Sequence, residues 1–286
     1  MMAQRAMPLL FVLIWATGFI VARGVAPHAE PLTFLLMRYG LTAAVFATLA
    51  VAVGAAWPTG AAGWRDALVA GILIQGIYLG GVFWAARHGM PAGISALISG
   101  LQPLLTAVLS FPLLGERVRS VQWLGIGVGF VGAVLVLLPK LGATEGIPAV
   151  PAVVCFMAVI GITLGTIWQK RTGSHADLRT NAAVQFIGAA LVTAPIAALT
   201  EEWTFDGSAP AWIGLLWSVF GLSVGAISLL LILIRRGAVA GVASLFYLVP
   251  PVVAVMAFFF FGERLNLVQI LGMALAAGGV ALANRT

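Results

Sequence analysis

The sequence predicts an all-α integral membrane protein with ten transmembrane helices, arranged as two inverted five-helix repeats. Three observations lead to this prediction. The chain is 62% hydrophobic and 8% charged with a mean hydropathy of +1.09, whereas soluble proteins are about half apolar and a quarter charged. Its apolar residues fall into ten runs near the length of about 20 residues that crosses a bilayer as a helix. The two halves resemble each other when they are offset by 147 or 148 residues.

Charges, Pro/Gly clusters and polar turns separate the ten runs from one another. A segment in hydrocarbon must satisfy its backbone hydrogen bonds internally, and a barrel would show short alternating segments, so we expect helices. The connections are short and leave almost no extramembrane domain. The expected spans are 7–24, 32–53, 66–86, 91–112, 120–138, 149–169, 179–199, 211–234, 238–261 and 265–283.

The basic residues between the spans predict that the N- and C-termini are both cytoplasmic. With this orientation ten Lys or Arg residues lie on the inner side and four on the outer side, as the positive-inside rule requires. The acidic residues Glu201, Glu202 and Asp206 share one outer loop. A cleaved signal peptide is the alternative for the apolar N-terminal stretch that follows Arg5. The counterpart of this stretch in the second half favours a span.

The internal repeat is clearest at the fourth and ninth spans. The stretch "RHGMPAGISALISGLQP" (87–103) aligns with "RRGAVAGVASLFYLVPP" (235–251), and Gly115-Glu116-Arg117 aligns with Gly262-Glu263-Arg264. Five spans per repeat is an odd number, so the second copy enters the membrane from the opposite side. Inverted repeats are typical of alternating-access transporters, and a duplicated scaffold or channel is the alternative. The expected division is a first repeat at 1–139, an inter-repeat loop at 140–148 and a second repeat at 149–286.

The ends of the two repeats resemble a known family. The stretches "LLGERVRSVQWLGIGVGFVGAVLVL" and "FFGERLNLVQILGMALAAGGVALA", with "WATGFIVARG" and "PLTFLLMRYG" near the start, resemble the EamA-type branch of the drug/metabolite transporter (DMT) superfamily. The resemblance spans the full chain, and within the branch the chain looks most like the YddG-type exporters of aromatic and other neutral amino acids. It implies a protein of the bacterial inner (cytoplasmic) membrane that exports small metabolites. The implied partners are a small-molecule substrate and the lipid bilayer.

Polar residues at mid-span are the candidate substrate contacts, because a polar group in hydrocarbon needs a partner or a wet cavity. In the third, fourth, eighth and ninth spans such residues occur at matched depth or helical spacing, and we expect them to face one place. Tryptophans near mid-span are candidate aromatic walls. For any one serine, a bond to its own helix is the alternative. The predicted substrate-binding residues are Trp15, Gln75, Tyr78, Ser95, Ser99, Gln102, Trp217, Ser223, Ser244 and Tyr247.

Prolines and glycines recur at matched places in the two repeats. Pro103 in "LQPLL" and Pro250-Pro251 in "LVPPVV" remove helix hydrogen bonds and predict hinges beside the cavity, with an inert packed kink as the alternative. The glycines of "GIGVGFVG" and "GMALAAGG" predict close helix packing, within the monomer or in a dimer. The single cysteine, Cys155, lies in an apolar run and predicts packing rather than a disulfide.

Charged residues are the remaining candidates for a structural or gating role. Arg38 is the only ionisable residue well inside a span, as either a structural clamp in the outer part of the bundle or a contact for a substrate carboxylate. Glu116-Arg117 and Glu263-Arg264 are expected at opposite membrane surfaces, as packing or gate-flanking pairs.

The sequence also excludes several classes of function. It has no G-x-x-x-x-G-K-[ST] motif and no metal-ligand cluster, and its basic residues are scattered, so we expect no enzyme, cofactor, metal or nucleic-acid partner. Because no Asp or Glu lies at mid-span, we expect facilitative export of neutral or zwitterionic metabolites through an aromatic cavity without fixed charge. Proton-coupled multidrug or metabolite efflux and a lipid-handling or scaffold protein are the alternatives. The oligomeric state is open, and a monomer is compatible with the sequence.

Overall fold

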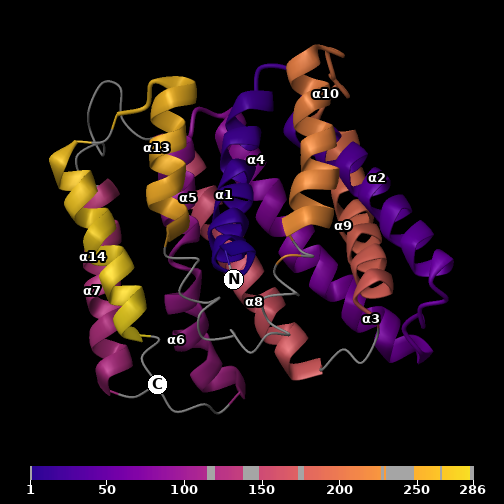
Figure 1. Ribbon diagram of the computed structural model, residues 1–286, viewed down its shortest axis with the longest axis horizontal. Coiled ribbons are helices and arrows are strands. Elements are labelled where there is room, and N and C mark those ends of the chain that lie inside the picture. Colours follow the sequence, from indigo (N-terminus) through magenta and orange to yellow (C-terminus); the bar gives the residue numbers. More distant parts are fainter. Residues whose placement is uncertain are drawn as a thin grey trace.

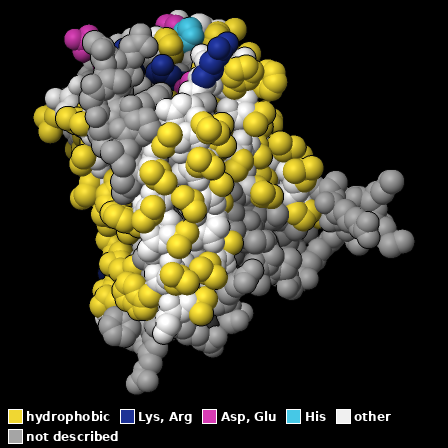
Figure 2. Space-filling model, turned by 90° about the vertical axis from the view of Figure 1, so that its left-hand side faces the viewer, with side chains coloured by type: hydrophobic (Ala, Val, Ile, Leu, Met, Phe, Trp, Pro, Cys, Tyr) yellow, Lys and Arg dark blue, Asp and Glu magenta, His cyan; other side chains and the backbone are white. Residues whose placement is uncertain are grey.

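The computed structural model describes residues 2–114, 120–137, 148–172, 177–226, 229, 248–264 and 266–283, and these residues form a bundle of helices (Figure 1). Six helices of the described part are long and apolar enough to cross a membrane, and shorter apolar helices lie among them. Figure 2 shows a side wall covered by hydrophobic side chains, with charged side chains gathered at the upper end. The chain is therefore a multi-pass, all-α membrane protein.

The helices of the first half follow the predicted spans closely. The third predicted span, 66–86, is longer than expected, because α3, η1 and α4 follow one another without a gap from residue 60 to residue 87. The helices are α1 (Met2–Val25), α2 (Pro31–Ala52), α3 (Gly60–Gly71), η1 (Ile72–Ile77), α4 (Tyr78–Arg87), α5 (Ala92–Ser99), α6 (Gln102–Leu114) and α7 (Ser120–Leu137).

The helices of the second half are described less completely. The end of the eighth predicted span from residue 227, apart from residue 229, and the ninth span up to residue 247 lie outside the described residues. The expected inter-repeat loop apart from Pro148 lies outside them as well. The described helices are α8 (Ala149–Thr172), α9 (Leu178–Thr200), α10 (Ala209–Leu216), η3 (Trp217–Ala226), α13 (Val249–Phe261) and α14 (Leu267–Ala283).

The fourth predicted span is two helices rather than one. α5 ends at Ser99 and α6 begins at Gln102, because Pro103 has no N–H with which to continue the ladder of α5. Leu101 closes the break with a backbone hydrogen bond of 3.1 Å to the Ile98 carbonyl. In the second half, Pro250 and Pro251 lie in the first turn of α13, where a missing N–H costs no helix bond. The hinge role of the three prolines stays a prediction.

Two segments of the bundle have the wider π-helical turn. Shifted by the repeat offset, η1 falls inside η3, so the third and eighth predicted spans share this feature. The sequence predicts ordinary α-helices here, since nothing in its periodicity distinguishes the two turns. π-helical turns are rare and occur often at functional sites, so η1 and η3 are candidate positions for a functional site.

The glycine stripes bring α7 and α14 together within one chain. A Cβ on Gly132 would overlap the backbone of Ala276 and lie 2.6 Å from the Gly272 carbonyl oxygen. A Cβ on Gly279 would likewise overlap the backbone of Gly129 on α7. The predicted close packing is therefore confirmed, and it occurs inside the monomer, as the neighbouring α7 and α14 in Figure 1 indicate.

At the end of the bundle where α10 begins and α13 ends, loops of the two halves are joined. The Glu30 backbone N–H donates to the Thr204 carbonyl at 3.0 Å, and Ala29 and Phe205 form an isolated β-bridge. Asp206 accepts from the Ser208 backbone N–H at 2.9 Å and lies 2.7 Å from Nδ1 of His28. Hydrogen bonds from Ser208 and then His28 lower the pKa of Asp206 to about 2, so this carboxylate stays ionised until the pH falls to that value.

Two glutamates of the second half cap helices of the first half at the same end. Glu201 accepts from the backbone N–H groups of Leu32 and Thr33 at 2.8 and 2.7 Å, in the first turn of α2. Glu263 accepts from the N–H groups of Ala92 and Gly93 at 3.0 and 3.3 Å, in the first turn of α5. Neither helix has a side-chain cap from its own N-cap residue. The carboxylates therefore supply the missing acceptors from outside.

We expect Glu201→Gln to lower the free energy of unfolding by about 1 to 2 kcal/mol, because a neutral amide accepts the two N–H groups and the Thr33 hydroxyl less strongly than a carboxylate. Thermal unfolding of the purified protein in detergent measures the change. Glu202→Gln is the matched control, since Glu202 is the adjacent residue and is exposed. Equal unfolding temperatures for the two variants would contradict the capping role.

Candidate functional site

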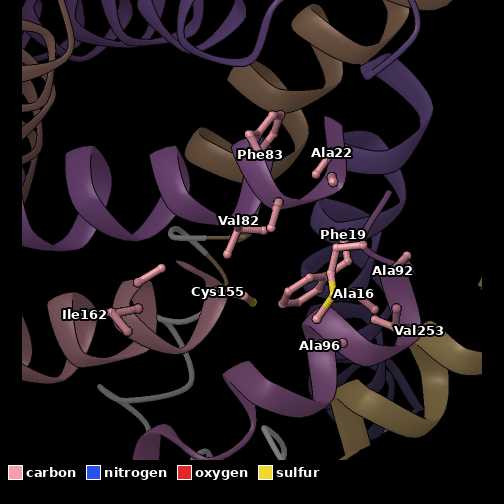
Figure 3. Close-up of a cluster of buried hydrophobic side chains, with 14 of the residues drawn as sticks. Ala16, Phe19, Ala22, Val82, Phe83, Ala92, Ala96, Cys155, Ile162 and Val253 are labelled. Carbon is pink, nitrogen blue, oxygen red and sulfur yellow. The ribbon is translucent and has the colours of Figure 1, made fainter. Parts of the chain in front are cut away.

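A cavity of about 100 Å³ lies between helices of the two halves. The first half contributes walls from α1, α2, η1 and α4, and the second half contributes α8, α9 and η3. Several of the lining side chains belong to the buried core, and Figure 3 shows Phe19, Val82 and Ile162 in one cluster with Cys155. The lining residues are Trp15, Gly18, Phe19, Arg38, Ile74, Gln75, Tyr78, Leu79, Val82, Phe83, Ile162, Phe186, Leu222 and Ser223.

The structure brings several predicted site residues together at this cavity. Trp15, Gln75, Tyr78 and Ser223 line it, although they come from four different helical segments. Gln75 and Ser223 occupy matched positions of the repeat, and each lies in a π-helical segment. The two halves therefore place equivalent polar positions at one cavity, as expected for a binding site between repeats.

Hydrogen bonds fix the position of η1 against α2. The hydroxyl of Tyr39, which is fully buried, donates to the Gln75 carbonyl oxygen at 2.7 Å. The same oxygen also accepts from the backbone N–H of Tyr78 at the end of η1. Tyr39 packs on Phe186 of α9 with ring centroids 6.0 Å apart. This arrangement holds the Gln75 region in place from both halves.

Ser223 makes hydrogen bonds both within its own helix, η3, and to α2. Its hydroxyl, on Ser223, donates to the carbonyl of Ser218, five residues earlier, at 3.0 Å. The hydroxyl oxygen of Ser223 also accepts a hydrogen bond from Nη2 of Arg38 at 3.3 Å. Because the Ser223 hydroxyl already uses its single proton on its own helix, it meets the arginine as an acceptor.

Arg38 brings a positive charge to the cavity wall. Arg38 is 6% exposed, and its Nε is buried without a hydrogen-bond partner among the described residues. The ion pairs within that part of the chain involve Asp206, Asp66 and Asp177, and none of them includes Arg38. The expectation of a cavity without fixed charge is therefore wrong, since the sequence does not show which way a mid-span arginine faces.

Much of the cavity wall is apolar and was not predicted. Phe19, Phe83 and Phe186 supply aromatic surface, and Leu222 and Ile162 supply aliphatic surface. No signal in the sequence separates these residues from other apolar residues of the spans, because core and lipid-facing positions have the same composition. Only the repeat alignment of Ser223 with Gln75 points to the neighbourhood of Leu222.

The other predicted substrate contacts that the structure describes do not line this cavity. Ser95 is buried and Ser99 half-buried on α5, and neither is among the lining residues. Gln102 is the half-buried first residue of α6. Trp217 is 40% exposed, and its indole N–H donates to the Thr17 hydroxyl at 2.7 Å. Ser244 and Tyr247 lie outside the described residues.

Of the other charged candidates, the two that the structure describes, Glu263 and Arg264, do not line the cavity. Glu263 caps α5, as described above, while Arg264 is exposed. Glu116 and Arg117 lie outside the described residues. Within the residues that the structure describes, no group of three or more His, Cys, Asp or Glu residues is placed to hold a metal ion.

Comparisons with known proteins agree with this architecture. Residues 6–138 and 150–285 each match the model of the EamA-like transporter family. The uncharacterized transporter YvbV of Bacillus subtilis is 25% identical over 283 residues, which cover 96% of this chain and 88% of YvbV. A probable amino-acid metabolite efflux pump of Escherichia coli is 26% identical, covering 95% of this chain and 91% of the pump. A crystal structure at 21% identity matches with a TM-score of 0.66 over 97% of this chain and 95% of its own, and shows the fold.

Proposed function

The chain belongs to the EamA-like transporter family, and from this premise we propose that it exports small neutral or zwitterionic metabolites, in particular aromatic, hydrophobic and other neutral amino acids. The family makes it a transporter with a small-molecule substrate and not an enzyme. We place it in the bacterial inner membrane with both termini in the cytoplasm, which the excess of basic residues on the inner side supports.

The observation that carries this proposal is the cavity shared by the two halves. Its aromatic and aliphatic walls suit the side chain of a hydrophobic amino acid, and a small number of polar groups, including Gln75 and Tyr78, suit its polar end. The name of the Escherichia coli relative, which calls that protein a probable amino-acid metabolite efflux pump, supports the same class of substrate.

Alternating access accounts for the way the cavity is built. The family model matches two separate stretches of the chain, which supports the proposed duplication into repeats of opposite orientation. Helices from both stretches line the cavity, so a rocking motion of one half against the other would open it to each side in turn. The break between α5 and α6 at Gly100 and Leu101 provides a place for such motion.

Export is proposed to follow the gradient of the substrate without proton coupling. Among the described residues that line the cavity, there is no Asp, Glu or His to carry a proton. The acidic residues of the described part lie in loops or near helix ends, as Glu30, Asp177 and Glu263 do. Flux through such a site depends on the substrate and not on a pH gradient.

Counterflow in proteoliposomes that contain only this protein tests the proposal. Vesicles loaded with unlabelled phenylalanine are expected to take up labelled phenylalanine, and other neutral amino acids outside the vesicles are expected to compete. An imposed pH gradient is expected to leave the uptake unchanged. Uptake driven by the pH gradient would replace facilitated export with proton-coupled efflux, and the absence of any counterflow for neutral amino acids would overturn the proposed substrate class.

A further inference from the structure

We propose that Arg38 binds the carboxylate of the transported substrate, so that the cavity selects molecules that carry a carboxylate beside an apolar group. This inference rests on the proposed function and names the chemistry that its binding site selects. It also chooses between the two sequence-based interpretations of Arg38, structural clamp and substrate contact, in favour of the second.

The first argument is the charge that the protein leaves unbalanced. A guanidinium buried in a membrane protein is costly unless a counter-charge or a full set of acceptors surrounds it. Arg38 is 6% exposed, no ion pair in the described part of the chain includes it, and the Ser223 hydroxyl is a neutral acceptor. An anion that enters the cavity would supply the missing counter-charge.

The second argument is the geometry of the guanidinium. Ser223 holds Nη2 at 3.3 Å, whereas Nε has no acceptor within the described residues. Nε is itself buried, but the guanidinium has five N–H donors, so the bond to Ser223 leaves other donors for a carboxylate. Since Arg38 lines the cavity, a ligand there has access to the side chain. The bond to Ser223 limits the rotation of the guanidinium and so prepares it for binding.

The third argument is the chemistry of the surrounding wall. Among the described lining residues Arg38 is the only charged one, and the others are mainly aromatic and aliphatic, including Trp15 and Phe186. In a low-dielectric site a charge-assisted hydrogen bond is stronger than in water. A carboxylate on Arg38 and an apolar substituent against the aromatic walls together match a hydrophobic amino acid.

The repeat itself shows that this charge is not a general requirement of the fold. The position that matches Arg38 in the second half is Gln185, which is buried on α9. The backbone of Gln185 packs against α3, where a Cβ on Gly71 would overlap it. Gln185 is not among the residues that line the cavity. One half therefore provides the cation, and the cavity holds one carboxylate.

Competition in the wild-type protein is the first arm of the test, and it needs no variant. Counterflow of labelled phenylalanine is challenged with unlabelled 3-phenylpropionate, which has the carboxylate but no amine, and with phenylalaninamide and phenethylamine, which have the amine but no carboxylate. The proposal expects inhibition by phenylpropionate and at least about 10-fold weaker inhibition by the amide and the amine, because a charged hydrogen-bonded pair is lost. Equal inhibition by all three compounds would overturn the role of Arg38.

Substitution of Arg38 is the second arm. Arg38→Gln, which installs the residue type of the matched position 185, is expected to reduce phenylalanine counterflow at least about 10-fold, and Arg38→Lys to reduce it less. Arg23→Gln is the matched control, since Arg23 is a half-buried arginine that donates to the Ala86 carbonyl at 3.2 Å outside the cavity. Wild-type flux in Arg38→Gln would overturn the inference.

Thermal unfolding measured without substrate distinguishes a substrate-binding role of Arg38 from a structural role as a clamp between helices. Removing an unpaired buried cation is expected to leave the unfolding temperature of Arg38→Gln unchanged or raised. A lowered temperature, with no stabilisation of the wild-type protein by phenylpropionate, would assign Arg38 to the clamp. If the wild-type protein transports no amino acid, the proposed function fails. If it transports phenylalanine and phenylalaninamide equally well, the proposed function stands and the Arg38 inference fails.

Discussion

Replacing Gly18 by leucine is expected to reduce transport to the level of protein-free liposomes while the protein stays folded. Gly18 lines the cavity from α1, and a Cβ built on it would meet only the methyl groups of Leu222, at an ordinary distance of 3.8 Å. The backbone therefore accepts a side chain at this position, and a leucine would extend into a cavity of about 100 Å³. Substrate and side chain would compete for the same space. Counterflow of labelled phenylalanine measures the loss.

Two substitutions provide the controls for this experiment. Gly18→Ala adds only the Cβ and is expected to retain most of the flux. Gly40→Leu adds the same side chain to an exposed position of α2, where nothing lies within 4 Å of a Cβ, and is expected to transport like the wild-type protein. Full flux in Gly18→Leu, with normal unfolding temperature, would contradict the assignment of this cavity as the transport site.

The second large effect is expected at the seam, which is the close interface between α7 and α14 around Gly132 and Gly279. Gly279→Ala should lower the free energy of unfolding by about 3 kcal/mol, the upper range for an overpacked core, because the new Cβ would overlap the Gly129 backbone and lie 2.6 Å from the Gly125 carbonyl oxygen. Backbone atoms have no alternative rotamer, so the two helices must separate to make room. Thermal unfolding in detergent and the yield of monodisperse protein measure the change.

The adjacent residue is the control for the seam. A Cβ on Gly278 would meet nothing within 4 Å, and Gly278→Ala is expected to be neutral or slightly stabilising, because alanine favours the helix. Similar unfolding temperatures for Gly278→Ala and Gly279→Ala would show that the two helices are not packed backbone to backbone.

The features that could be predicted from the sequence depend on composition and repetition. The spans follow from runs of apolar residues, and the seam follows from the small residues of "GIGVGFVG" and "GMALAAGG". The pairing of Gln75 with Ser223 follows from the repeat alignment, which matches these two positions at an offset of 148 residues. Each of these features depends only on the types of residue and on their order in the chain.

Other features depend on tertiary contacts and left no mark in the sequence. The π-helical turns of η1 and η3 have the same apolar composition as an α-helix. The caps that Glu201 and Glu263 supply belong to helices about 170 residues away in the chain, since the bonds to Leu32 and Ala92 span 169 and 171 residues. The direction of Arg38 depends on the packing of α2 against η3, which hydropathy does not report.

Together these contacts join the two halves of the bundle. The caps from Glu201 and Glu263 join the halves at one end of the bundle, while the cavity lies between helices of both halves. Release of these caps would free the first turns of α2 and α5, the helix that ends at the break before Pro103. The Glu201→Gln experiment measures the strength of one of these two contacts.

Substrate protection of a thiol at position 18 tests the central claim, that this cavity is the transport site, most directly. Gly18→Cys and Gly40→Cys are each made in a Cys155→Ala background, since Cys155 is the single cysteine of the chain. The rate of maleimide labelling is then measured with and without saturating phenylalanine. Phenylalanine is predicted to slow labelling at position 18 and to leave the rate at position 40 unchanged. Equal rates at position 18 with and without phenylalanine would contradict the claim.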